Sequence, residues 1–160
     1  MAAGLPVRIQ APDKDLFQLV RDADPSVRVI APKKGWVVDE AEVKARLGVT
    51  PAQVIDFQAL VGDATDGVVG VKGVGAKTAA ALLTARGSLD AIYADLDAVK
   101  TLPIRGAKSL AGKLEAGRAD AMLARRLVTL LTDVDMGDDP LTQCVLSLIH
   151  ISEPTRQIRI

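Results

Sequence analysis

Two pairs of aspartates are the residues of this 160-residue chain whose types and spacing best suit chemistry. Asp13 and Asp15 follow a short predicted strand, and an extended chain directs side chains at i and i+2 the same way. Asp63 and Asp66 are spaced i, i+3, which places both on one face of a helix or turn. Converging carboxylates without Cys or His suit Mg²⁺ or Mn²⁺. Two such ions can activate water and stabilise the leaving oxygen of a phosphodiester.

Either pair alone is weak evidence, because aspartate is also common at strand ends and helix caps. A glycine-rich loop, GVKGVGAKT over residues 70–78, follows the second pair directly and supports the interpretation. It is not a nucleotide P-loop, because Ala76 shifts Lys77 out of the required register. It is not a dinucleotide fingerprint either, because Thr78 stands where a third glycine is needed and the segment before the loop is predicted to be helical.

A hairpin between two helices is the remaining phosphate-binding interpretation of this loop. Its glycines permit tight turns, and the free N–H groups at the start of the next helix face an anion. Lys72 and Lys77 add positive charges to the same place. Such contacts hold phosphates without reading bases, so they predict duplex binding without sequence preference. A plain glycine-rich turn that packs two helices together is the alternative.

The strands and helices predicted from the sequence must position these residues. Hydrophobic alternation and turn signals predict strands over 6–9, 27–31 and 35–38. Periodicity and capping residues predict helices over 13–20, 39–48, 50–62 and 76–84, one capped by Ser88, and one over 107–132 with a break near Gly117. A brief β-rich start followed by many helices indicates the end of an α/β domain joined to a helical module.

Composition places the chain among soluble globular proteins, with 49% apolar and 25% charged residues and no net charge. The charge is segregated, since residues 67–119 carry eight Lys/Arg against four Asp/Glu, and residues 1–66 carry eight against ten. The single cysteine, Cys144, excludes an internal disulfide and a Cys-based zinc site, and suits a reducing cytosol. No export signal or membrane span is predicted.

Two long motifs carry a family resemblance. VRIQAPDKDLFQLV is similar to a strand followed by T-G/A-D-K-D-x-x-Q-L. GVTPAQVIDFQALVGDATDGVVGVKGVGAKTA is similar to G-V-x-P-x-Q-x-x-D-x-x-x-L-x-G-D-x-S-D-N-x-P-G-V-x-G-I/V-G-x-K-T-A. From about residue 6 to 135, the chain resembles the C-terminal half of the bacterial 5′–3′ exonuclease domain, which occurs at the start of DNA polymerase I and in free-standing flap-endonuclease-like proteins.

The resemblance implies a fold, an activity and a site. The fold is the end of a PIN-like parallel sheet, an α/β remnant, followed by a mostly α-helical helix–three-turn–helix (helix-hairpin-helix-like) module that binds DNA. The activity is metal-dependent hydrolysis of DNA at 5′ ends or flaps in replication and repair, by a cytoplasmic, bacterial, monomeric protein without a nucleotide cofactor. The implied ligands of two Mg²⁺ or Mn²⁺ ions are Asp13, Asp15, Asp63 and Asp66. The implied DNA-binding residues are Gly70, Lys72, Gly73, Val74, Gly75, Lys77 and Thr78, and a potassium ion is implied on the main chain of Val71 and Val74.

The sequence departs from the family pattern without losing a carboxylate. Ala11 and Pro12 replace Thr-Gly, and Pro12 lacks an N–H and fixes φ. Thr65 replaces Ser, and Gly67 and Val69 replace Asn and Pro, which loosens the turn after the second aspartate pair.

The resemblance also predicts a division of the chain. Residues 1–38 are predicted to end an α/β nuclease core, 39–140 to form the helical DNA-binding domain, and 141–160 to be a tail. LSLIHISEPTR, at the start of 146–160, is similar to a translated transposase-type sequencing adapter, so 146–160 is expected to be non-native and His150 to have no catalytic role; a native amphipathic tail is the alternative. Without the N-terminal half of the family domain, this chain is expected to hold half a metal site and to be inactive alone. The alternative function is a non-catalytic, sequence-independent duplex-binding module.

Overall fold

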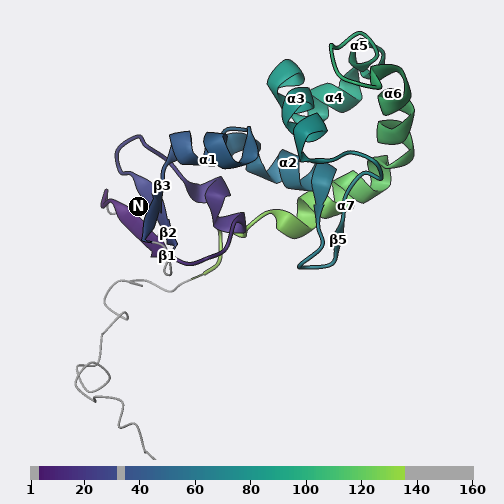
Figure 1. Ribbon diagram of the computed structural model, residues 1–160. Coiled ribbons are helices and arrows are strands. Elements are labelled where there is room, and N and C mark those ends of the chain that lie inside the picture. Colours follow the sequence, from purple (N-terminus) through teal and green to yellow (C-terminus); the bar gives the residue numbers. More distant parts are fainter. Residues whose placement is uncertain (1–3, 32–34, 136–160) are drawn as a thin grey trace, which may run out of the picture. The chain divides into compact units, whose positions relative to one another are not determined.

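The computed structural model describes residues 4–31 and 35–135 (Figure 1). One compact unit runs to Leu130, and a second unit begins at Leu131. The boundary expected after residue 38 stays a prediction. The expected tail 141–160, with Cys144, His150 and the adapter-like 146–160, lies outside the described residues.

Three short strands form a small sheet at the start of the described chain. β1 (Val7–Gln10) pairs in parallel with β2 (Val27–Ala31), and β2 pairs antiparallel with β3 (Trp36–Val38). All three predicted strands are therefore present, and the parallel pair agrees with the expected α/β start. The predicted helix over 13–20 is instead a short 3₁₀ helix, η1 (Asp15–Leu19), because Val20 leaves it in an extended conformation.

Helices make up most of the rest, as predicted. They are α1 (Glu40–Leu47), the 3₁₀ turn η2 (Pro51–Gln53), α2 (Val54–Val61), α3 (Ala76–Arg86), α4 (Leu89–Ala94), α5 (Leu96–Val99), α6 (Ala107–Ala116) and α7 (Arg118–Val128). Ser88 caps α4 by accepting from the Ala91 N–H, and Gly117 separates α6 from α7, as expected. The four-residue α5 was not predicted, since it is too short to show periodicity. No described helix has the length and apolar character to cross a membrane.

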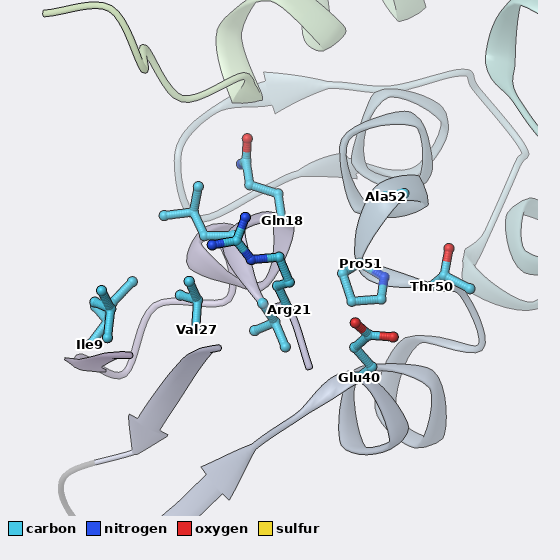
Figure 2. A pocket seen from close by; sticks show the side chains of 11 residues that line it. Ile9, Gln18, Arg21, Val27, Glu40, Thr50, Pro51 and Ala52 are labelled. Carbon is cyan, nitrogen blue, oxygen red and sulfur yellow. The ribbon is translucent and has the colours of Figure 1, made fainter. Parts of the chain in front are cut away.

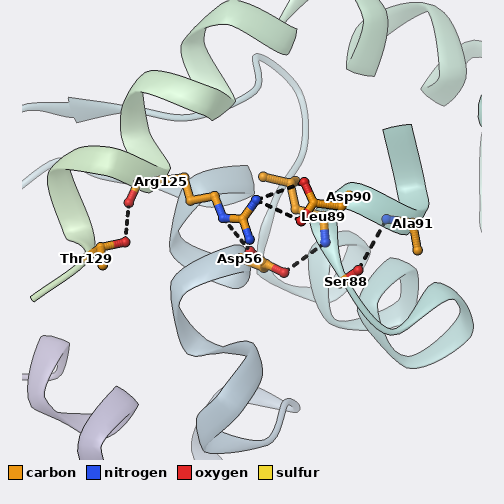
Figure 3. A network of polar contacts seen from close by, with 7 residues as sticks. All are labelled: Asp56, Ser88, Leu89, Asp90, Ala91, Arg125 and Thr129. Atoms are coloured by element: carbon orange, nitrogen blue, oxygen red, sulfur yellow. Dashed lines mark hydrogen bonds and ion pairs between the residues drawn. The ribbon is translucent and has the colours of Figure 1, made fainter. Parts of the chain in front are cut away.

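Helix α2 lies at the centre of the helical part, alongside α7 and against α3 (Figure 1). It carries a buried carboxylate, Asp56, which accepts the Leu89 N–H at 2.8 Å and pairs with Arg125 Nε at 3.3 Å. The Arg125 guanidinium also reaches the exposed Asp90 at 2.9 Å (Figure 3). A buried charge is tolerated only when it is paired and hydrogen-bonded. Asp56 therefore ties α2 to the start of α4 and to α7.

A tight hairpin follows α2. β4 (Gly62–Asp63) pairs antiparallel with β5 (Val68–Val69), and the chain then returns across the end of α2, where the Val71 N–H donates to the Leu60 carbonyl at 2.9 Å. A Cβ on Gly70 would lie 2.3 Å from the Gly62 nitrogen, so the two backbones touch where only glycine fits. The segment expected to be helical or turn-like at Asp63 and Asp66 is thus a strand residue followed by a turn.

A cavity of about 650 Å³ opens between the sheet with η1 on one side and α1 with η2 on the other (Figure 2). Its lining is mostly apolar and includes Ile9, Val27 and Pro51. None of the aspartates or loop residues singled out from the sequence lines it. The size of this cavity therefore does not identify it as the candidate functional site.

The Gly62–Gly70 contact yields a stability prediction. Gly70→Ala forces a methyl group into backbone atoms that cannot rotate away, and we expect a loss of about 3 kcal/mol in the free energy of unfolding. The measurement is urea denaturation followed by circular dichroism. The control is Gly112→Ala on α6, where an added Cβ meets nothing within 4 Å, and which we expect to be neutral or stabilising by up to about 1 kcal/mol. Equal stability of the two variants would contradict the prediction.

The contacts of Asp56 yield a second stability prediction. Asp56→Ala leaves the buried Leu89 N–H without an acceptor, and we expect a loss of about 2–3 kcal/mol in the same assay. Asp90→Ala is the matched control, because it removes only the exposed partner of the same arginine. Its expected cost is below about 0.5 kcal/mol. A larger effect at Asp90 than at Asp56 would show that the buried carboxylate does not hold the helices together.

Candidate functional site

Three of the four candidate aspartates come together. Carboxylate oxygens of Asp15, Asp63 and Asp66 all lie within 4.8 Å of one another. Asp15 begins η1, Asp63 is a buried residue of β4, and Asp66 lies exposed in the turn between β4 and β5. The β4–β5 hairpin therefore brings two acids against a third from the segment that follows β1.

The fourth aspartate, Asp13, is not part of this group of three. Its Oδ1 accepts the Asp15 N–H at 2.9 Å, so the two residues form a turn and not the expected extended pair. The strand β1 ends at Gln10, and the chain turns before η1 starts. Asp13 does line the cavity of about 330 Å³ at the carboxylates, together with Pro12, Lys14, Asp63, Thr65 and Asp66.

Lys14 is a site residue that the sequence analysis did not single out. Its Nζ lies 2.7 Å from Oδ2 of the buried Asp63. This close ion pair holds the pKa of the Asp63 carboxyl below its ordinary value, against the effect of burial, and raises the pKa of Lys14. The only signal in the sequence was the position of Lys14 inside the D-K-D motif. Lys14 neutralises part of the charge that the converging acids create.

Gln58 is the second residue that sequence reasoning missed. This buried side chain of α2 donates its Nε2 hydrogen bond to Asp15 Oδ1. Burial raises the pKa of Asp15, the Gln58 hydrogen bond opposes that rise, and the charges of the neighbouring aspartates add to it. A polar amide in the otherwise apolar run VIDFQALV was the available signal.

The donor set fits a hard divalent cation. Three carboxylates supply oxygen ligands, which are those that Mg²⁺ and Mn²⁺ prefer. Burial is the main cause of the raised pKa of Asp15, and repulsion from the neighbouring aspartates adds to it; a bound cation would relieve that repulsion. Thr65 further fixes Asp63 by donating its N–H to Oδ1 at 3.0 Å.

The glycine loop lies directly after the hairpin. Val71 and Val74 are buried and anchor it, and the Val74 N–H donates to the Val71 carbonyl at 3.0 Å. Between them Lys72 is exposed, and Gly73 has a φ of +81°, a conformation that favours glycine. The loop thus presents one lysine outward from a tight turn on two buried valines.

Helix α3 begins where this loop ends. Gly75 is its N-cap and supplies no side-chain acceptor, so no side chain of the cap residue covers the first N–H groups of the helix. Lys77 is exposed in the first turn, and Thr78 is half-buried beside it. Unfilled N–H groups with a nearby cation form a place that favours an anion.

Comparison with protein families and curated relatives gives consistent results. The family model described as "5′-3′ exonuclease, C-terminal SAM fold" matches residues 49–149. DNA polymerase I of Pseudomonas aeruginosa is 43% identical over 157 residues, which cover 98% of this chain and 16% of that protein. A 5′-3′ exonuclease of Buchnera aphidicola is 31% identical over 131 residues, covering 82% of this chain and 45% of that protein. The chain therefore spans less than half the length of these relatives.

Solved structures share the fold. Bacteriophage T5 5′-exonuclease with bound zinc ions has a TM-score of 0.64 at 22% identity, over 77% of this chain and 42% of that one. The T5 flap endonuclease in a complex with DNA and metal ions has a TM-score of 0.60 at 22% identity, with the same coverage. At this identity the likeness establishes the fold alone.

The Lys14–Asp63 pair yields a pH prediction. A lowered carboxyl pKa contributes stability above its ordinary value of 3.8 and loses it as the pH falls through the folded-state pKa. We expect Lys14→Met to cost about 1 kcal/mol at pH 7, a figure discounted because Lys14 is 47% exposed. The difference in the free energy of unfolding between Lys14→Met and wild type should disappear as the pH falls below the ordinary carboxyl pKa of 3.8.

The measurement is urea unfolding in metal-free buffer at a series of pH values. Lys100→Met is the control, because it removes an exposed ion pair with Asp97 and should leave stability unchanged at every pH. A constant difference between Lys14→Met and wild type down to strong acid would count against the pair.

Proposed function

Because the chain belongs to the 5′–3′ exonuclease family, we propose that it is part of a structure-specific 5′ nuclease. This protein hydrolyses DNA phosphodiesters at 5′ ends or flaps with two divalent metal ions, in DNA replication and repair in the bacterial cytoplasm, and acts as a monomer. The observation that carries the proposal is the convergence of Asp15, Asp63 and Asp66 beside a loop suited to phosphate. This chain, which spans a minor part of its relatives, supplies part of that nuclease.

Asp15, Asp63 and Asp66 would hold one ion, and Asp13, which lines a cavity with Asp63 and Asp66, would be a further ligand. A bound Mg²⁺ or Mn²⁺ supplies an activated water and stabilises the leaving oxygen. The protein's own residues orient the carboxylates: Gln58 donates to Asp15, and Lys14 and the Thr65 N–H hold the two oxygens of Asp63. We propose that residues outside this chain, which spans only part of its relatives, complete the site, and we expect the chain by itself to be inactive.

The loop and the start of α3 would bind the duplex backbone. Lys72 and Lys77 contribute charges, the α3 N–H groups meet a phosphate, and the glycines let the backbone approach. The DNA-binding residues proposed are Gly70, Lys72, Gly73, Val74, Gly75, Lys77 and Thr78, as part of a helix–three-turn–helix module. The main-chain carbonyls of Val71 and Val74 are proposed to hold a potassium ion.

The test is cleavage of a 5′-flap duplex in Mg²⁺ by the longer protein that includes the upstream coding sequence. Asp66→Asn should lower the cleavage rate about 100-fold or more, because it removes one of the carboxylates proposed to hold the metal ion. Asp66 is exposed, so the substitution should not disturb packing. Asp120→Asn, an exposed aspartate on α7, is the control and should leave the rate unchanged. Undiminished cleavage by the Asp66 variant would contradict the metal assignment.

A non-catalytic duplex-binding module is the second candidate, favoured by the loop geometry. It predicts that the longer protein binds duplex DNA in a salt-sensitive manner and cleaves no flap under any divalent metal. Flap cleavage that depends on Asp66 excludes it.

A further inference from the structure

A lysine from a distant segment lies over the glycine loop. Lys113 is on α6, well beyond the loop motif in the sequence, and its side chain is exposed. An ideal Cβ on Gly73 would lie 3.2 Å from Lys113 Nζ, 3.4 Å from its Cδ and 3.5 Å from its Cε. The outer half of the lysine side chain therefore lies across the face of Gly73 that has no side chain. Any larger residue at position 73 would displace it.

Helix α6 packs into the core and approaches the loop closely at its C-terminal end. Leu110 and Leu114, on its buried face, belong to the core. Gly117, which ends the helix, comes so close to Val71 that a Cβ there would lie 2.9 Å from Val71 Cγ1. The stem of Lys113 is thus positioned by buried contacts on both sides, while its ammonium group stays at the surface.

The Lys113 ammonium group forms no ion pair or hydrogen bond with any residue in the described part of the chain. The acid closest in sequence, Glu115, is two positions further on and therefore points to a different face of α6. A charged side chain placed against a backbone turn without an acid partner is suited to an anion from outside the protein. The loop already presents Lys72 on its other exposed position.

We propose that Lys113 is a third phosphate-binding cation of the 71–78 loop and contacts the same duplex DNA backbone as Lys72 and Lys77. This inference rests on the proposed DNA binding and extends it beyond the loop motif. A lysine ammonium binds phosphate as a point charge, so Lys113 adds affinity and salt dependence without sequence preference. Gly73 then has two roles, to make the turn and to leave room for this lysine.

The test is fluorescence anisotropy of the 160-residue chain with a labelled blunt duplex, in EDTA, at salt concentrations from 50 to 200 mM. Lys113→Ala should reduce the slope of log affinity against log salt by about 0.9. Between the lowest and the highest salt, the affinity of the variant should therefore fall about threefold less than that of wild type. Lys113→Arg should restore the slope. Alanine favours helix at this exposed position, so the variant should melt at the wild-type temperature.

Lys108→Ala is the matched control, since it removes an equal charge from α6 about 140° around the helix. Its slope should equal that of wild type. If Lys72→Ala lowers the slope and Lys113→Ala does not, the inference is overturned while the proposed DNA binding stands. Equal losses in the Lys108 and Lys113 variants also overturn it, because position over the loop would then be irrelevant. If the wild-type chain binds no duplex at any salt, both fail.

Discussion

The contact between the backbones of Gly62 and Gly70 is the constraint on which the rest of the site depends. It brings the two ends of the β4–β5 hairpin together at the C-terminal end of α2, at a distance that leaves no room for a Cβ. Two of the three clustered carboxylates lie inside the hairpin, and the glycine loop follows it directly. Asp63 and Asp66 are within the hairpin, and the loop proposed to bind phosphate begins where the Val71 N–H donates to the end of α2. The contact between these two glycines therefore determines where the two hairpin aspartates and the glycine loop lie.

Repulsion within the cluster of carboxylates lowers the stability of the folded state, and neighbouring residues reduce this repulsion. Like charges within 4.8 Å raise one another's free energy in the ionised state. Lys14 offsets part of this repulsion at Asp63, and Gln58 offsets part at Asp15. Elsewhere along α2, apolar residues pack into the core and Asp56 connects the helix to α4 and α7. The same short helix thus carries one carboxylate that stabilises the fold and one amide that supports the site.

The sequence predicted the elements whose signals are local. Ser88 and Gly117 marked helix ends correctly because caps and breaks depend on neighbouring residues alone. The extended geometry expected for Asp13 and Asp15 was wrong, because the end of β1 is set by its pairing with β2 and not by local preference. Lys14, Gln58 and Lys113 were missed for a related reason. Their partners Asp63, Asp15 and Gly73 are far along the chain, and no periodicity records such contacts.

In the proposed nuclease, this arrangement separates two kinds of selectivity. Lysine ammonium groups and helix N–H groups hold phosphates of any sequence, so the loop contributes nothing to base recognition. The hairpin, however, joins that loop to the carboxylates through a few residues of paired backbone. The spacing between the loop proposed to bind phosphate and the carboxylates of the hairpin is therefore set mainly by main-chain geometry, which side-chain substitutions change least. In the proposed nuclease, this arrangement would hold the duplex without reading its bases and would keep the held phosphate at a set distance from the carboxylates.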